Sequence, residues 1–121
     1  EKDILNEILG QLGKNPDLEN MNALVFSSEK WHPGVVGIVA SRLVDLFSRP
    51  TFVISLKDGV GKGSGRSVSD FNMHKGLQQC ASLLLSYGGH YRAAGISIKE
   101  DDIDEFACLL DEIIRNSVQS S

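Results

Sequence analysis

Residues 61–67 combine glycine, hydroxyl and basic side chains in a pattern that suits an anionic ligand. The segment reads Gly-Lys-Gly-Ser-Gly-Arg-Ser. Glycines let backbone N–H groups converge on an oxyanion, hydroxyls add donors, and the arginine offers a planar fork that matches phosphate. It is not a Walker A loop, because no Gly-Lys-Ser/Thr follows at the required spacing. The spacing leaves two interpretations open, a twisted hairpin whose glycines relieve strain or a phosphate site with the contacts Gly63, Ser64, Gly65, Arg66 and Ser67.

A second candidate segment is 88–95, which reads Gly-Gly-His-Tyr-Arg-Ala-Ala-Gly. It follows a helical apolar stripe, so we expect the two glycines to end a helix and to present the histidine and arginine on a turn. The small residues after them would let a ligand approach closely. The alternative is a capped helix followed by a solvated histidine. The candidate phosphate contacts in this segment are Gly88, Gly89, His90 and Arg92.

The segment 31–34, Trp-His-Pro-Gly, precedes an apolar helical pattern. Trp31 could stack on a nucleobase, and the helix N-terminus beyond Gly34 would favour an anion. Spacing alone favours the other interpretation, in which Trp31 is a core or capping residue. Trp31 and His32 are nonetheless kept as candidate nucleic-acid contacts.

Residues of other catalytic classes are missing or poorly placed. Asp45, Asp58 and Asp70 form no convincing carboxylate cluster. Nothing resembles a two-metal site, a nucleophile with its base or a cofactor loop. Cys80 and Cys108 lie on apolar helical stripes without metal-ligand spacing, which predicts reduced core thiols in a cytosolic, cytoplasmic protein. We therefore expect no metal and no cofactor to bind this part of the protein.

The charge is unevenly distributed along the 121 residues. The formal net charge is −4, but residues 30–99 carry nine Lys and Arg against three Asp, a local balance of +6. An anionic ligand responds to the potential within a Debye length of about 8–10 Å, so the acidic total does not exclude nucleic acid. No apolar run is long enough for a helical membrane span, so no membrane partner is expected.

The pattern of apolar residues predicts eight elements. Helices are expected over 3–12, 34–48 and 71–87, and a last one opens with a capping box at Asp102 and Glu105. Strands are expected over 23–28, 51–56, 61–67 and 94–99, with a hairpin turn at 58–59. This order predicts an α/β fold with a mixed central sheet of about four to five strands flanked by helices.

The expected organisation is a single domain with extensions. Residues 1–22 are predicted to be a helix and linker from an upstream domain, 23–115 the domain itself, and 116–121 a frayed tail. The chain begins with Glu1 rather than Met, so we expect an excised piece of a longer parent without a secretory leader.

Three stretches, in order, resemble the RecJ exonuclease family. Residues 31–43, Trp-His-Pro-Gly-Val-Val-Gly-Ile-Val-Ala-Ser-Arg-Leu, resemble a segment typical of these enzymes. Residues 61–67 resemble the family's Gly-Ser-x-Arg-Ser motif. Residues 88–95 resemble the Gly-Gly-His-x-x-Ala-Ala-Gly motif of the DHH-associated domain. The resemblance covers roughly residues 23–110.

The resemblance implies a parent that degrades single-stranded DNA from the 5′ end, in DNA repair and recombination. It would use two Mn²⁺ or Mg²⁺ ions held by an upstream DHH domain, its partner in the same chain. This piece has no Asp-His-His and is expected to be inactive alone. Ser64 and Arg66 would hold backbone phosphate, and His90 would reach the scissile phosphate. Open alternatives are a related oligoribonuclease or nucleotide phosphatase, and a pure interaction module.

Overall fold

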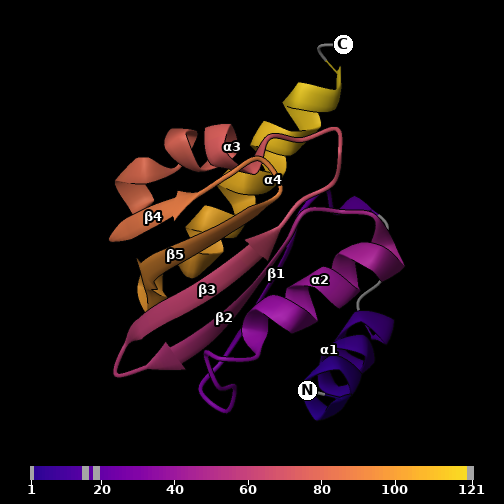
Figure 1. Ribbon diagram of the computed structural model, residues 1–121, viewed down its shortest axis with the longest axis vertical. Coiled ribbons are helices and arrows are strands. Elements are labelled where there is room, and N and C mark those ends of the chain that lie inside the picture. Colours follow the sequence, from indigo (N-terminus) through magenta and orange to yellow (C-terminus); the bar gives the residue numbers. More distant parts are fainter. Residues whose placement is uncertain (1, 15–16, 18–19, 120–121) are drawn as a thin grey trace.

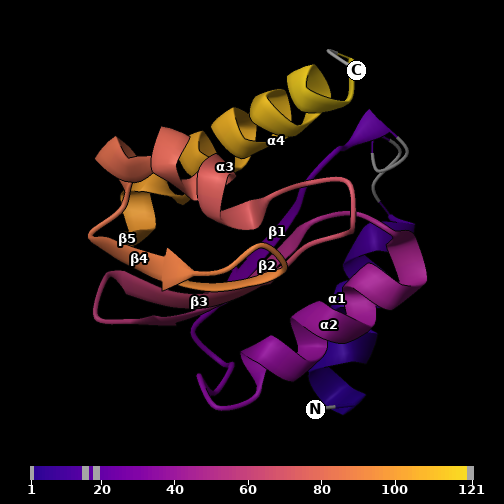
Figure 2. The same ribbon diagram turned by 45° about the horizontal axis from the view of Figure 1, so that its top comes forward.

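A five-stranded sheet lies between two layers of helices in the computed structural model, which describes residues 2–14, 17 and 20–119 (Figure 1). Helices α1 and α2 cover one face of the sheet, and α3 and α4 cover the other (Figure 2). The elements in chain order are α1 (Lys2–Gly13), β1 (Leu24–Ser28), α2 (Val36–Phe47), β2 (Thr51–Lys57), β3 (Val60–Arg66), α3 (Met73–Gln79), the 3₁₀ turn η2 (Ala81–Leu83), β4 (Ser86–Gly89), β5 (Ala93–Lys99), the 3₁₀ turn η3 (Glu100–Asp102) and α4 (Ile103–Gln119).

The sheet is mixed, with strand order β1-β2-β3-β5-β4. β1 and β2 are parallel and joined through α2, whereas the other neighbours are antiparallel. The β2–β3 hairpin closes with a two-residue loop in which Asp58 has φ 54° and Gly59 has φ 80°. This is the left-handed geometry that favours Asp-Gly in tight hairpins. The predicted fold class is therefore confirmed, and so is the hairpin turn.

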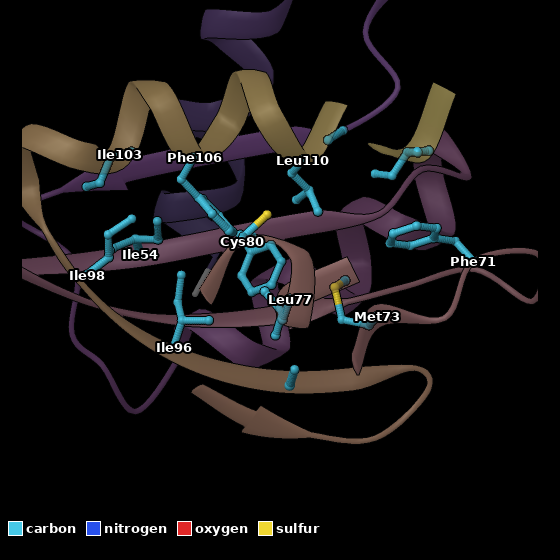
Figure 3. Close-up of a cluster of buried hydrophobic side chains, with 14 of the residues drawn as sticks. Ile54, Phe71, Met73, Leu77, Cys80, Ile96, Ile98, Ile103, Phe106 and Leu110 are labelled. Carbon is cyan, nitrogen blue, oxygen red and sulfur yellow. The ribbon is translucent and has the colours of Figure 1, made fainter. Parts of the chain in front are cut away.

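The side chains on the two faces of β2 belong to two separate hydrophobic clusters, because side chains alternate along a strand. Phe52, Ile54 and Leu56 point toward α3 and α4, where the ring of Phe52 meets that of Phe106 edge-on at 5.3 Å. Figure 3 shows this cluster, with Leu77 and Cys80 of the α3 side facing the residues of α4. Val53 points the other way, into a cluster with α1 and α2.

The glycines of β3 face the α3 and α4 cluster and are needed for its packing. An added Cβ would lie 2.5 Å from Ile54 at Gly61, 2.8 Å from Ile54 at Gly63 and 2.3 Å from Phe52 at Gly65. β3 is also paired along its length with β2 and β5, which engages its N–H groups in the sheet. The expected convergence of these amides on an anion is therefore wrong.

The predicted helix over 71–87 is too long. α3 ends at Gln79, and after a 3₁₀ turn the chain forms the edge strand β4, which pairs with β5. The N–H of Leu85 already donates to the carbonyl of Ser97 at 2.8 Å, so tertiary pairing overrides the local pattern. Gly88 and Gly89 thus lie in a strand and do not cap a helix.

The N-terminal helix packs onto the domain, where its Ile8 and Leu12 are buried. Helix α1 is fixed to the domain by the indole Nε1 of Trp31, which donates to Glu7 at 2.9 Å. Helix α4 continues to Gln119, so residues 116–119 of the predicted tail are assigned to a helix, while 120–121 lie outside the described residues. Helix α1 ends at Gly13, close to the end of the predicted helix over 3–12. Within the described part of the chain, no helix is long and apolar enough to cross a membrane.

Candidate nucleic-acid interface

The face of β3 opposite its glycines carries Lys62, Ser64 and Arg66. This arrangement follows from the strand period of two, which sends Gly61, Gly63 and Gly65 to one side and the polar residues to the other. Lys62 is exposed, and the other two polar side chains are half-buried. The basic and hydroxyl groups of the motif thus form one polar row beside α2.

The register extends this row across the sheet with small side chains. Lys62 pairs with Ser97, which pairs with Ser86. Ser64 pairs with Gly95, which pairs with Gly88. Paired residues lie on the same face of a sheet, so this face is polar near β3 and nearly bare over β5 and β4.

An open cavity of about 480 Å³ lies over this face. It brings together parts of all three motif segments, which are far apart in the sequence. The lining residues are Pro33, Val36, Lys62, Gly63, Ser64, Ser86, Tyr87, Gly88, Gly95, Ile96 and Ser97.

Two glycines on the floor of this cavity are not explained by packing. An added Cβ at Gly88 would meet no atom within 4 Å, and at Gly95 it would meet only the carbonyl oxygen of Gly63, at 3.8 Å. Neither residue has a positive φ. Glycine weakens a strand and often marks a close approach of a ligand. The fold could accommodate side chains at both positions, and their absence keeps the cavity floor open.

Arg66 lies at the edge of this surface with its guanidinium held in place. Its Nη1 donates to the carbonyl of Gly65 at 2.7 Å, and its Nη2 lies beside Gly37 in the first turn of α2. The bond uses one of the five N–H donors of the guanidinium. The side chain therefore combines a fixed orientation with further donors for a ligand.

His90 and Arg92 occupy the β4–β5 hairpin loop, and both are exposed. The loop is fixed by hydrogen bonds at 2.8 Å from the Ser67 N–H to the Arg92 carbonyl and from the Met73 N–H to the Tyr91 carbonyl. The Tyr91 hydroxyl also donates to the Ser69 carbonyl at 2.6 Å. Because Arg66 pairs with Ala93, the loop lies at the Arg66 end of the polar row, outside the cavity lining.

Gly89 gives this loop its shape. Its φ is 151°, and an added Cβ would lie 2.5 Å from the carbonyl oxygen of Ala93 and 2.5 Å from the Cα of Ala94. Only glycine fits this combination of backbone angle and close backbone approach. This glycine therefore shapes a hairpin and not the helix end that the sequence predicted.

Two predicted contact residues are buried and form hydrogen bonds within the protein. Trp31 is only 3% exposed, and its carbonyl accepts a bond from Ser55 Oγ at 2.5 Å. Its ring has no open face for a nucleobase, so the stacking role is wrong and the core interpretation is confirmed. Ser67 is 5% exposed, and its Oγ donates to the Phe71 carbonyl at 2.8 Å. Its hydroxyl is therefore not available to a phosphate.

His32 shapes the entry to α2. The residue is exposed, and its Nδ1 accepts a hydrogen bond from the N–H of Gly34 at 2.9 Å. This bond closes the turn that places Pro33 and Val36 against the cavity. The ring therefore supports the wall of the candidate site, and its Nε2 is not used by that bond.

The described residues offer no set of ligands that would hold a divalent ion. No group of three His, Cys, Asp or Glu side chains gathers in this part of the chain. Burial raises the pKa of the Cys80 thiol from 9.0 to about 11, which keeps it neutral. Cys108 is exposed, so the prediction that it is a core thiol is wrong. The manganese or magnesium implied for the parent therefore does not fit the described residues of this chain.

Sequence reasoning named part of this surface and missed the rest. Gly63, Ser64 and Gly88 line the cavity as predicted contacts, whereas Lys62, Ser86 and Ser97 were not predicted. The alternation of glycine with polar residues over 61–66 was the signal that could have identified Lys62. Ser86 and Ser97 had no such signal, because β4 was not expected to be a strand.

The mixed sheet with helices on both faces and the small-residue cavity define an α/β domain in which two motif segments come from adjacent antiparallel hairpins. The DHHA1 domain family matches residues 20–116. The chain belongs to this family.

Relatives of known name that resemble the chain are single-stranded-DNA-specific exonucleases called RecJ. The protein from Bacillus subtilis is 42% identical over 101 residues, covering 82% of this chain and 13% of the relative. The Escherichia coli protein is 40% identical over 90 residues, covering 70% of this chain and 16% of the relative. The chain thus spans a small part of the length of the curated relatives it matches.

Solved structures of RecJ proteins have a similar fold. RecJ from Thermus thermophilus in complex with Mn²⁺ superimposes with a TM-score of 0.81 at 32% identity, covering 95% of this chain and 16% of that chain. The C-Ala domain of Aquifex aeolicus alanyl-tRNA synthetase gives a TM-score of 0.63 at 20% identity, covering 77% of this chain and 88% of that chain. The second likeness shows the fold alone, so function must be argued from the site.

Proposed function

We propose that this chain is the substrate-binding domain of a RecJ-type exonuclease, which hydrolyses single-stranded DNA from the 5′ end in the cytoplasm, in repair and recombination. The observation that supports the proposal most directly is the convergence of three motif segments on one cavity. Lys62, Ser64 and Arg66 line up along one face of β3 beside it. These are the donor types that hold phosphate.

The polar row has the length expected for a backbone grip. Alternate residues of a strand are about 7 Å apart, since each residue rises about 3.4 Å. Lys62 and Arg66 are therefore separated by roughly 13 Å along β3, which is enough for more than one phosphate of a strand. In this proposal Ser64 and Arg66 hold phosphate near the 5′ end, and Lys62 holds a neighbouring phosphate.

The cavity floor is proposed to admit the sugar and base next to these phosphates. Gly88 and Gly95 leave open space there, and no atom lies within 4 Å of the Cβ position at Gly88. A ligand can therefore approach the sheet backbone closely. Exclusion of duplex DNA would come from the opposite wall of the cleft, which the expected upstream DHH domain would supply.

His90 is proposed to face the scissile phosphate, with Arg92 as a further phosphate contact. Both are exposed on a hairpin loop that three hydrogen bonds fix to residues 67–73. In the parent, the divalent ions would be held by the upstream domain. His90→Ala in the full-length parent should reduce kcat more than substrate affinity if the contact strengthens in the transition state. Equal losses in both would argue against this role.

The first test is a titration of a labelled single-stranded oligonucleotide at low and moderate salt. A duplex of the same sequence serves as the control ligand, and Arg66→Ala serves as the test variant. We expect salt-sensitive binding of the single strand, with a slope lowered by about 0.7 in the variant because one phosphate contact is lost. If the chain alone does not bind, the same substitution is measured in the full-length parent.

The parent's preference for substrate length separates the remaining classes. Long single strands should be degraded more efficiently than dinucleotides. A clear preference for dinucleotides would indicate an oligoribonuclease or nucleotide phosphatase of the same superfamily. Unchanged oligonucleotide affinity after Arg66→Ala in both forms would instead indicate an interaction module.

A further inference from the structure

Gly37 lies in the first turn of α2, directly beside the side chains of the proposed phosphate grip. A Cβ added at this position would lie 2.8 Å from Nη2 and 3.6 Å from Cζ of Arg66, and 3.5 Å from Oγ of Ser64. These three atoms are the nearest neighbours of the missing side chain. The space above Gly37 is therefore occupied by the functional groups of β3.

The helix itself gives no reason for glycine at this position. Gly37 is not among the residues with positive φ in the described chain. Glycine lowers helix stability relative to alanine, and the buried residues of α2, which are Val36, Val39, Ala40 and Leu43, do not include it. The close approach of Arg66 is the feature of the structure that a larger residue would disturb.

We propose that Gly37 is a positioning residue for Arg66. The bond from Nη1 to the Gly65 carbonyl, at 2.7 Å, fixes one edge of the guanidinium. The bare backbone at Gly37 lets the other edge approach α2, which keeps the fork beside Ser64. The inference rests on the proposed function, because it explains how the arginine of that site is oriented.

A methyl group at position 37 should displace the guanidinium and leave the fold intact. A contact of 2.8 Å between carbon and nitrogen is well inside the usual separation of non-bonded heavy atoms. Nη2 is the end of a flexible side chain, so it moves more easily than the helix backbone. Gly37→Ala should therefore weaken phosphate binding without lowering stability, a combination that a purely structural glycine would not produce.

The test uses the full-length protein that contains this chain. The variants are Gly37→Ala, Arg66→Ala and the double substitution. Gly10→Ala is the matched control, since Gly10 lies in helix α1 and its Cβ position has no neighbour within 4 Å. Affinity is measured by fluorescence anisotropy with a 5′-phosphorylated single-stranded oligonucleotide in EDTA, which prevents metal-dependent digestion of the probe. Urea unfolding of each variant gives its stability.

Gly37→Ala should weaken binding by about tenfold, the scale of one charged hydrogen bond, with an unfolding midpoint no lower than that of the wild type. Gly10→Ala should bind normally. In the Arg66→Ala background, Gly37→Ala should have no further effect, because its target is gone. Wild-type affinity of Gly37→Ala, or an equal loss in both backgrounds, would refute the positioning role alone. Wild-type affinity of Arg66→Ala would refute the proposed phosphate grip and the positioning role together.

Discussion

Gly95 of β5 lies directly opposite Ser64 of β3, on the face of the sheet that carries the cavity. The residue after Ser64, Gly65, points to the opposite face, where the ring of Phe52 fills the space that a Cβ would need. Glycine is thus present at these two positions for different reasons. One is required by the core, and the other leaves room at the surface.

Gly95→Val should block the proposed ligand and preserve the fold. The Cβ position is open, and valine is a better strand residue than glycine. We expect an unfolding free energy equal to or above that of the wild type, and single-strand affinity reduced by roughly tenfold or more. Unchanged affinity in the anisotropy titration would show that no ligand occupies the floor of the cavity.

Gly65→Ala should lower the stability of the domain, in contrast to Gly95→Val. The added carbon would lie 2.3 Å from the Phe52 ring, and overpacking of this kind costs about 1–3 kcal/mol. Urea unfolding should show the loss. A variant as stable as the wild type would mean that Phe52 has room to move and that the core explanation of this glycine is wrong.

Gly89→Val should destabilise the domain and disturb the loop that presents His90. The φ of 151° and the backbone neighbours at 2.5 Å both oppose a side chain, and strained backbone alone costs about 1–3 kcal/mol. Gly88→Val is the matched control, because its Cβ position has no neighbour within 4 Å. Thermal unfolding should separate the two variants, and equal midpoints would contradict the argument.

Substitution of the two serines of the motif should affect different properties, ligand binding for Ser64 and stability for Ser67. Ser64→Ala should reduce single-strand affinity with little change in unfolding, since its hydroxyl lies on the polar row. Ser67→Ala should cost about 1–3 kcal/mol of stability, because the Phe71 carbonyl loses its buried donor. The salt dependence of binding should not change in Ser67→Ala. If Ser64→Ala lost stability and Ser67→Ala lost affinity, the roles of the two serines would be exchanged.

Cys80 should make the domain less stable at alkaline pH. Its folded pKa is raised from 9.0 to about 11 by burial, so the unfolded chain loses this proton first. The stabilising contribution is complete below pH 9 and is lost as the pH rises toward 11. Unfolding free energies measured across this window should fall, and Cys80→Ala should flatten that part of the profile. A profile identical to that of the wild type would rule out this thiol as the cause.

Cysteine labelling at pH 8 should distinguish the exposed thiol of Cys108 from the buried thiol of Cys80. Cys108 is exposed and should react with an alkylating reagent in the native protein, whereas buried Cys80 should react only after unfolding. Mass spectrometry of the labelled peptides distinguishes the two sites.

The amino-acid sequence by itself determined most of the elements and the family. Apolar periods predicted α1, α2 and the start of α4, because amphipathic patterns report burial directly. The β-branched and aromatic residues of β2 predicted a strand, and β5 was also predicted as a strand. Asp58 and Gly59 predicted the hairpin turn, because few residues adopt its positive φ. The motif around Ser64 and Arg66 pointed to phosphate because guanidinium and hydroxyl donors suit that ligand.

Only the tertiary structure decided which motif residues are available to a ligand. Lys62 and Ser64 face the cavity, whereas Gly65, Ser67 and Trp31 are used by the core. Sequence spacing cannot tell these groups apart, because the distinction depends on which face of β3 meets Phe52 and which meets α2. The short strand β4 was also undetectable, since its four residues are all exposed and depend on pairing with β5 for their conformation. Long-range pairing of this kind leaves no local pattern to predict it.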